Sequence, residues 1–227
     1  MTHDTFGAPA PAYRGAVEAG PVWVIVVAAG RATRFGRPKQ YEVLAGRRVL
    51  DWSLAAARSV ATGVVVVVPP GTDVEPEPAA DRTVAGGATR SASVRAGLAA
   101  VPSDAAVVVV HDAARPLASE ELFARVVDAV REGADAVVPV VAVADTLRRR
   151  SGGVVDRDEL VAVQTPQGFR AAALRDAHAT AAEATDDASL VEQLGGTVVL
   201  VDGDPSNRKI TDPADLGAAE GMLQRCT

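Results

Sequence analysis

Short apolar runs alternate along the chain with longer segments of mixed polarity. The apolar runs, rich in valine and with few polar residues, occupy residues 22–28, 63–68, 105–110, 134–140 and 197–201. Because a strand of a parallel sheet is covered on both faces, continuous apolar runs favour such a sheet. The intervening segments predict helices at residues 49–62, 91–101, 118–132, 170–182, 187–195 and 213–224. We therefore expect an α/β fold, a three-layer sandwich with a mostly parallel sheet.

Two of the predicted helices begin with a recognisable local signal. Ser119 precedes two acidic residues and is a good N-cap for the third helix. Pro213 lies where the last helix would begin, a position that tolerates proline because its missing N–H would have no helical partner.

Residues 141–163 break the alternation of runs and helices. Two short segments of alternating polarity flank the turn residues Ser151, Gly152 and Gly153, which predicts a β-hairpin. An isolated hairpin with little core of its own is only marginally stable in water. We therefore expect a protruding β-arm that packs on something else, and a second subunit is one candidate.

The N-terminal residues 1–21 are rich in alanine, proline and glycine and predict a disordered tail. Residues 22–227 would then form a single domain. The first residues do not resemble a signal peptide, and no apolar run approaches the length of a membrane span. We expect a cytoplasmic protein that has no membrane partner.

Composition and charge exclude several classes of function. The chain has 227 residues, of which 48% are hydrophobic and 4% aromatic, so its core must be built from alanine, valine and leucine. A formal net charge of −6 argues against nucleic-acid binding, which requires basic surface. The single cysteine, Cys226, excludes a disulfide framework within the chain and a cysteine-based metal site.

Lysine is rare in this chain and therefore informative. Only two of the 23 basic residues are lysines, Lys39 and Lys209, and the others are arginines. The ammonium of lysine is compact and rotatable, and a guanidinium replaces it poorly where one point charge is needed. Each lysine lies in a loop that follows a predicted strand, where ligands bind in open α/β sheets.

The first such loop has the sequence AAGRATRFGRPKQ, residues 28–40. Gly30 permits a tight turn whose backbone amides could bind phosphates, and several cationic side chains follow. Ala32 stands where a dinucleotide fingerprint requires its second glycine, and the GK[ST] ending of a Walker loop is absent. The alternative is a structural turn with a solvated basic face.

The second loop begins with His111 and Asp112 and continues to Pro116. An Asp at the end of a buried strand is well placed to hold Mg²⁺, which prefers carboxylates and substrate phosphates. Arg115 offers a planar pair of donors for phosphate or hydroxyl groups. Asp112 could instead cap a turn, and we expect His111 to be a buried histidine with satisfied hydrogen bonds.

Two further loops complete the set. Paired glycines, Gly86 and Gly87, would allow a flat ligand to approach closely, and Ser93 could hydrogen-bond it; a plain loop with an N-cap is the alternative. The last loop, residues 206–211, contains Lys209 and the only asparagine of the chain, Asn207.

Taken together, these residues resemble a known family. The motifs AAG, R, PKQ, GG…S…S, HDAARP, DT, TPQ, TDDAS and NRKIT, in that order, are similar to those of the 2-C-methyl-D-erythritol 4-phosphate cytidylyltransferases. The resemblance extends from about Val22 to Leu223. It implies a Rossmann-like nucleotidyltransferase sheet with a β-arm, and transfer of a cytidylyl group from CTP to methylerythritol phosphate with Mg²⁺ as cofactor.

The resemblance also assigns roles to individual residues. Those implied to meet the reacting phosphates are Arg34, Lys39 and Lys209, with Asp112 as the Mg²⁺ ligand. Those implied to form the nucleotide pocket are Ala28, Ala29, Gly30, Gly86, Gly87 and Ser93. Those implied to contact the second substrate are Arg115, Thr146, Arg157 and Thr165. Thr146 and Arg157 lie on the arm, which in this family reaches into the active site of a partner subunit, so a homodimer is implied.

Two positions depart from the family pattern. Ala32 replaces the second glycine of the first loop, so either the loop needs no positive φ at that position or its shape differs slightly. Ala88 stands where many relatives carry an acidic residue beside the cytosine. If base recognition there uses backbone groups, little is lost; if it does not, the affinity for CTP should be lower.

Three other functions compete with this prediction. A ribitol 5-phosphate cytidylyltransferase shares the fold and CTP, but that family tends to have AGG and HDAVRP in place of AAG and HDAARP. A nicotinamide-dependent oxidoreductase is disfavoured by the broken glycine fingerprint and by the absence of an acidic residue at Val68-Pro69. A binding-only relative is disfavoured because Lys39, Asp112 and Lys209 are all retained.

Overall fold

The computed structural model of the chain describes residues 13, 15–17, 19–30, 35–71, 74–180 and 182–224. Arg34, Ala32 and Cys226, which the sequence singled out, lie outside the described residues. Within the described part of the chain, every helix is too short or too polar to cross a lipid bilayer.

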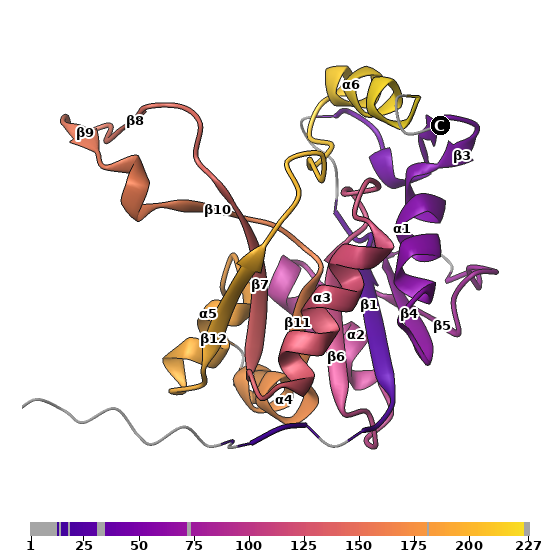
Figure 1. Ribbon diagram of the computed structural model, residues 1–227. Helices are drawn as coiled ribbons and strands as arrows, with labels where there is room; N and C mark the ends of the chain where they lie inside the picture. The colour runs from indigo at the N-terminus through magenta and orange to yellow at the C-terminus, as the bar shows by residue number, and fades with distance from the viewer. Residues whose placement is uncertain are drawn as a thin grey trace, which may run out of the picture.

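An eight-stranded sheet forms the centre of the molecule (Figure 1). Its strand order is β10 (Val161–Val163), β7 (Ala136–Ala142), β11 (Gln167–Arg170), β6 (Val107–Asp112), β1 (Val22–Val27), β4 (Gly63–Val68) and β5 (Arg82–Ala85), with β12 (Val198–Asp202) paired to β7. The four strands from β6 to β5 are parallel, as are β7 and β12. Strand β11 runs antiparallel to both β6 and β7, and β10 runs antiparallel to β7. The predicted three-layer, mostly parallel fold is confirmed.

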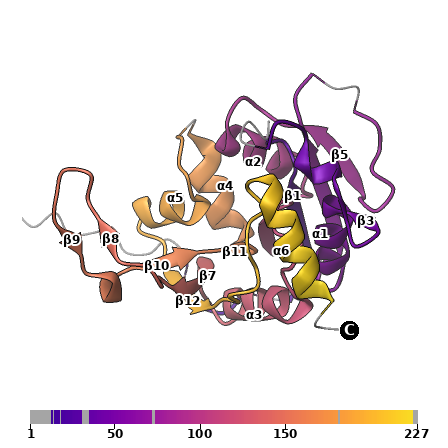
Figure 2. The ribbon, with the colours of Figure 1, turned by 90° about the horizontal axis from the view of Figure 1, so that it is seen from above.

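Helices cover both faces of the sheet. One face carries α1 (Val49–Arg58) and α3 (Glu120–Arg131); the other carries α2 (Arg90–Ala99), α4 (Ala171–Ala179) and α5 (Asp187–Gln193) (Figure 2). Alternation along β1 divides the core accordingly, because neighbouring side chains of a strand point to opposite faces. Val24 packs with Leu54 of α1, whereas Ile25 packs with Val94 of α2.

A smaller apolar cluster lies beside this main core. It contains Leu44 from a two-stranded hairpin, β2 (Val43–Leu44) and β3 (Arg47–Arg48), and Ala219 from α6 (Pro213–Leu223). The short 3-10 helix η1 (Lys39–Tyr41) packs against α1 next to this cluster. The cluster therefore anchors the segment that carries Lys39.

The helix signals and most strand positions are confirmed, with shifts at the boundaries. Ser119 caps α3 by accepting the N–H of Leu122 at 3.2 Å, and Pro213 is the first residue of α6. Strand β6 ends two residues later than the apolar run suggested, because His111 and Asp112 pair with β1.

Strands β5 and β11 were not predicted from the sequence. Their residues, RTVA and QGFR, lack an apolar run, and their strand character comes from pairing with neighbours. A short segment without an apolar run can be a strand when neighbouring strands satisfy its backbone groups, which is information that local pattern does not contain.

The predicted arm is present and projects from β7 and β10 (Figure 1). It consists of β8 (Leu147–Arg148), β9 (Val154–Val155) and the 3-10 helix η2 (Arg157–Glu159). Gly152 and Gly153 form its turn with φ angles of 107° and 83°, which favour glycine.

Part of the N-terminal segment packs on the domain, contrary to the expectation of disorder. The N–H of Val17 donates to the carbonyl oxygen of Arg131 at 3.0 Å, and Arg170 donates to that of Gly15 at 2.7 Å. The hydroxyl of Tyr13 donates to Asp176. For these residues the prediction of a disordered tail is wrong, because polar groups at the ends of α3 and β11 and on α4 bind them.

Candidate active site

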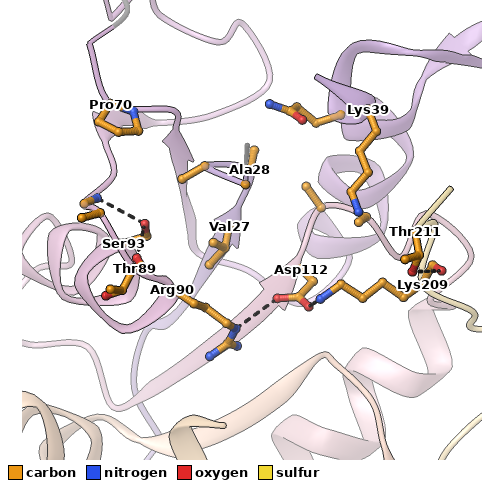
Figure 3. A pocket seen from close by; sticks show the side chains of 17 residues that line it. Val27, Ala28, Lys39, Pro70, Thr89, Arg90, Ser93, Asp112, Lys209 and Thr211 are labelled. Carbon is orange, nitrogen blue, oxygen red and sulfur yellow. Dashed lines mark hydrogen bonds and ion pairs between the residues drawn. The ribbon is translucent and has the colours of Figure 1, made fainter. Parts of the chain in front are cut away.

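A cavity of about 420 Å³ lies at the carboxyl ends of the parallel strands (Figure 3). Strands β1 and β6 end in register, Val27 beside Asp112, so the loops that follow them leave from the same edge of the sheet. The segments after β4 and β5 supply Pro70 and the 87–90 stretch to the same cavity. The topology thereby brings four loops, far apart in sequence, to one place.

Most of the predicted site residues line this cavity. They are Ala28, Ala29, Gly30, Lys39, Gly87, Ser93, Asp112 and Lys209. Gly86, Arg115 and Thr165 are not among the lining residues, but each contacts a residue of the site or of its loops. The residues that sequence reasoning did not assign to the site are Val27, Gln40, Pro70, Thr89, Arg90, Ala113, Ala114 and Thr211.

Asp112 lies between two cations, as Figure 3 shows. Its Oδ2 is 2.6 Å from the Nζ of Lys209, and its Oδ1 is 3.4 Å from the Nε of Arg90. Burial alone would raise the pKa of Asp112, but the charges of Lys209 and Arg90 lower it by more than burial raises it. The net result is a pKa well below the usual value. Asp112 is therefore an anion at neutral pH, as a metal ligand must be.

His111 is a buried structural residue, as expected. Burial lowers the pKa of His111 to about 4, so its ring is neutral at neutral pH. Its Nε2 lies 3.2 Å from the carbonyl oxygen of Arg115, which only accepts, so Nε2 carries the proton. Its Nδ1 must then accept, and the Thr165 hydroxyl donates to it at 3.2 Å.

Thr165 connects this histidine to Asp112 at the end of strand β6. While its hydroxyl donates to His111, the same oxygen accepts the backbone N–H of Asp112 at 3.0 Å. Thr165 was predicted to contact the second substrate, but the structure gives its hydroxyl a supporting role behind Asp112. Its side chain is buried, with 5% of the residue exposed.

The paired glycines are required by close packing. A Cβ atom on Gly86 would lie 2.6 Å from the Cβ of Ala29, and one on Gly87 would lie 2.4 Å from the Cβ of Ala92. The Ser93 hydroxyl accepts the N–H of Gly87 at 3.2 Å and donates to the carbonyl of Thr89 at 2.9 Å. Ser93 thus shapes the loop. Because its only hydroxyl proton is donated to Thr89, it could bind a ligand directly only by accepting a second hydrogen bond.

The loop after β12 is held by buried polar contacts. The Nδ2 of Asn207 donates to the carbonyl of Thr165 at 2.9 Å, and the residue is fully buried. Arg115 donates to the carbonyl of Asn207 at 2.8 Å. The Nζ of Lys39 donates to the carbonyl of Ile210 at 2.6 Å. The rare asparagine therefore serves to place Lys209 and its neighbours, and Ile210 is a core residue.

Arg90 belongs to a buried network of charged side chains that the sequence did not reveal. Its Nη1 is 2.6 Å from Oδ2 of Asp187, whose Oδ1 is 3.0 Å from Nε2 of His178. Burial would raise the pKa of Asp187, but the hydrogen bond from His178 and the charge of Arg90 bring it below its usual value. The TDDAS motif, which contains Asp187, was the available signal, yet only the fold places it beside Arg90.

Gln40 is a second lining residue that sequence reasoning left without a role. The residue is 3% exposed, and its Nε2 has no hydrogen-bond partner among the described residues. A buried amide in that state is well suited to donate to a ligand in the cavity.

With the fold and the cavity established, comparison with known proteins assigns the chain to a family. The family described as IspD, 2-C-methyl-D-erythritol 4-phosphate cytidylyltransferase, matches residues 22–225. The chain belongs to this family. A cytidylyltransferase of that name from Nocardia farcinica is 46% identical over 222 residues, which cover 91% of this chain and 95% of the relative.

A solved structure of a family member supports the same assignment. The crystal structure of the Thermus thermophilus cytidylyltransferase aligns with a TM-score of 0.77 and 42% identity, covering 88% of this chain and 98% of that one. A bifunctional IspD/IspF enzyme of Dinoroseobacter shibae is 46% identical over 216 residues. The chain spans only 54% of that relative's length, and the match covers 89% of this chain.

The arm residues expected from the cytidylyltransferase family do not line the cavity of their own chain. Thr146 is exposed, and Arg157 donates to the carbonyl of Ala144 at 2.6 Å. Neither is among the lining residues, and Figure 1 shows the arm extending away from the body of the domain. Within one chain, therefore, the structure does not bring these two residues to the other predicted site residues.

The donor set around Asp112 fits a magnesium site of one particular kind. The described residues contain no group of three or more His, Cys, Asp or Glu side chains able to hold a metal. Mg²⁺ commonly uses one or two carboxylates together with substrate phosphates and water. A single buried carboxylate in a cytidylyltransferase cavity lined by cations fits that mode, and it does not fit an all-protein metal site.

Proposed function

We propose that this chain transfers the cytidylyl group of CTP to 2-C-methyl-D-erythritol 4-phosphate and releases pyrophosphate. One observation carries the proposal: Lys39, Asp112 and Lys209 line a single cavity at the sheet edge of a chain that belongs to the cytidylyltransferase family. The cavity, about 420 Å³, lies in the size range of small-ligand sites. CTP as a substrate also favours the cytoplasm as the compartment.

The reaction forms one bond and breaks one. A phosphate oxygen of methylerythritol phosphate attacks the α-phosphorus of CTP and forms a new P–O bond. The bond between that phosphorus and the oxygen bridging to the β-phosphate breaks, and pyrophosphate leaves with the electron pair. Because an ionised phosphate is already a nucleophile, no side chain has to remove a proton. Catalysis then rests on positioning and on balancing negative charge.

The cationic side chains of the cavity supply that charge balance. Lys39 and Lys209 come from two different loops on the same side of the cavity, and each ammonium can point at a different phosphate oxygen (Figure 3). Arg34, outside the described residues, is proposed as a third cation on family resemblance alone. Arg115, whose guanidinium is committed to the carbonyls of Asn207 and Val163, supports the Lys209 loop.

Mg²⁺ is proposed as the cofactor, with Asp112 as its protein ligand. When bound, the ion would neutralise charge on phosphate oxygens. Thr165, which donates to His111, accepts the backbone N–H of Asp112, so the carboxylate is presented in one orientation.

The opposite end of the cavity is proposed to bind the nucleoside. It is lined by small residues, Ala28, Ala29 and Gly87, and by Ala88 and Pro70. These residues leave room for a flat base and expose backbone groups, which carry the recognition because Ala88 has no polar side chain.

We also propose that the arm acts in a homodimer. Leu147 and Val154, at 36% and 56% exposed, are apolar side chains on an element whose two strands pair only with each other. A second subunit that covered them would place Thr146 and Arg157 near its own cavity, where they could hold the methylerythritol phosphate.

The test is a pyrophosphate-release assay with CTP and Mg²⁺, comparing methylerythritol 4-phosphate with ribitol 5-phosphate. We expect turnover with the first and little with the second. A preference for ribitol phosphate would overturn the substrate assignment and leave the chemistry standing. Release with neither acceptor would contradict the proposed function altogether.

A further inference from the structure

The chain's own cations cover both oxygens of the carboxylate that is proposed to hold Mg²⁺. Lys209 approaches Oδ2 of Asp112 at 2.6 Å and Arg90 approaches Oδ1 at 3.4 Å. Asp112 is 9% exposed, so few other directions of approach remain. A divalent cation that arrives alone would have to displace a cation and remain close to its charge.

The two cations differ in how firmly they are held. Arg90 is anchored by Asp187, at 2.6 Å, and the Asp187 side chain is 1% exposed and also contacts His178. The Arg90 side chain itself is 24% exposed. These buried contacts fix the guanidinium, so Arg90 is not the cation that leaves.

Lys209, by contrast, can exchange its partner. Its side chain is 43% exposed, and the acceptor that the structure gives its ammonium is Asp112. The backbone around it is pinned, because Ile210 donates to the carbonyl of Ala114 at 2.8 Å and Asn207 is buried. Only rotation about the flexible lysine side chain is needed to move the ammonium from a carboxylate to a neighbouring phosphate.

We propose that Lys209 occupies the carboxylate of Asp112 and so prevents a divalent metal ion from binding there until a nucleoside triphosphate binds. The triphosphate offers the ammonium new anionic acceptors, Lys209 moves to them, and the released Oδ2 becomes available to the metal. Lys209 thus makes metal binding depend on nucleotide binding. The inference deepens the proposed function and rests on it for the identity of the triphosphate.

This role predicts that one substitution changes two affinities in opposite directions. In Lys209→Met, Mn²⁺ without nucleotide should bind about tenfold more tightly than in the native chain, since a charge in contact with the carboxylate has gone. CTP in the presence of EDTA should bind about tenfold more weakly, since a cation for its phosphates has gone. If Lys209 were needed only for structure, its substitution would weaken the binding of both Mn²⁺ and CTP.

Direct binding measurements on the full chain test this, because they need no turnover. Mn²⁺, which shares the oxygen-ligand preference of Mg²⁺, can be followed by the loss of the free-ion electron paramagnetic resonance signal, and CTP by calorimetry. Lys209→Arg keeps the charge and should stay within about twofold of the native Mn²⁺ affinity. Lys39→Met is the matched control: it removes a cation of the same cavity whose ammonium donates to Ile210.

Three results would overturn the proposal. They are equal Mn²⁺ affinity of Lys209→Met and the native chain, an equal gain in Lys39→Met, or a gain that persists in Lys209→Met combined with Asp112→Asn. Circular dichroism of each variant verifies that the fold is retained. Failure of the proposed function would instead show as absent pyrophosphate release by the native chain, whatever the Mn²⁺ affinities are.

Discussion

The hydroxyl oxygen of Thr165 lies 3.0 Å from the backbone nitrogen of Asp112 and accepts its N–H, although 53 positions separate the two residues. This hydrogen bond fixes the last residue of β6 at the mouth of the cavity. Thr165 also donates to His111, so one buried hydroxyl organises the strand end from which the carboxylate projects. The position of Asp112 is thus set by a contact that no local pattern contains.

Thr165→Val should destabilise the protein and lower kcat more than it raises KM. The substitution keeps the shape of the side chain but leaves the Asp112 N–H and the His111 Nδ1 without partners. A buried unsatisfied group costs about 1–3 kcal/mol. Urea denaturation and pyrophosphate release measure the two effects. Thr165→Ser retains the hydroxyl and should restore both; an unfolding free energy of the valine variant equal to the native one would refute the role.

Lys39→Ala should abolish turnover without affecting the fold. The Lys39 ammonium lines the cavity, and loss of a donor that stabilises developing charge typically costs about 10²–10³ in rate. Single-turnover pyrophosphate release is the measurement, and thermal unfolding checks integrity. Near-normal release by this variant would remove Lys39 from the reaction centre.

Gly86→Ala and Gly30→Ala should differ in stability although both glycines belong to the predicted nucleotide pocket. A Cβ on Gly86 would lie 2.6 Å from Ala29 and 2.8 Å from the Ser93 hydroxyl, whereas one on Gly30 meets no atom of the described residues within 4 Å. Overpacking of this kind costs about 1–3 kcal/mol, so only Gly86→Ala should lower the unfolding free energy. Equal stabilities in urea denaturation would contradict the packing argument.

The stability of the protein should depend on His111 in mildly acidic solution. Burial lowers the pKa of His111 to about 4, below the value of about 6.5 for an exposed histidine. Between these values the unfolded chain binds the proton and the folded chain does not. The contribution is therefore complete above about pH 6.5 and is lost as the pH falls toward 4.

His111→Gln tests this dependence, because glutamine can still donate to the carbonyl of Arg115 but does not titrate. The unfolding free energy of the native chain should fall more steeply between pH 6.5 and 4 than that of the variant, by up to about one proton, or roughly 1.4 kcal/mol per pH unit. Parallel pH profiles in urea denaturation would show that His111 does not remain neutral in the fold.

Val154→Asp should yield a folded monomer with little activity. Val154 is 56% exposed on the arm, so its replacement should not disturb the core, but a charge there would oppose burial against a second subunit. Sedimentation velocity measures the association state, and pyrophosphate release measures the activity. Val74→Asp is the matched control, because Val74 is 42% exposed in the loop between β4 and β5, away from the arm. A dimeric and active Val154→Asp variant would contradict the proposed role of the arm.

Several features of the site could be predicted because they depend on position relative to a strand. Lys39, Asp112 and Lys209 each follow or end a strand of the predicted sheet, and the carboxyl ends of parallel strands meet at one edge. The β-hairpin of the arm was also predictable, since its glycine turn is a local signal. What the arm contacts was not, because no local pattern encodes a partner.

Other features required the packed molecule. Asp187 lies in the TDDAS motif, but the ion pair that it forms with Arg90 joins residues that are 97 positions apart. Strand β11 was missed because QGFR has no strand pattern and becomes a strand only between β6 and β7. Thr165 is predicted to contact the second substrate, and only the packed structure reveals that its hydroxyl also binds His111 and Asp112.

The sequence by itself determined the alternation of buried strands and helices, the edge of the sheet at which ligands bind, and the residue types available there. Periodicity and turn chemistry are local, so these features can be recognised without a structure. Only the tertiary structure decided which charges pair. The contact between Lys209 and Asp112 spans 97 positions, and it exists because buried polar groups in distant loops must satisfy one another once the sheet has brought them together.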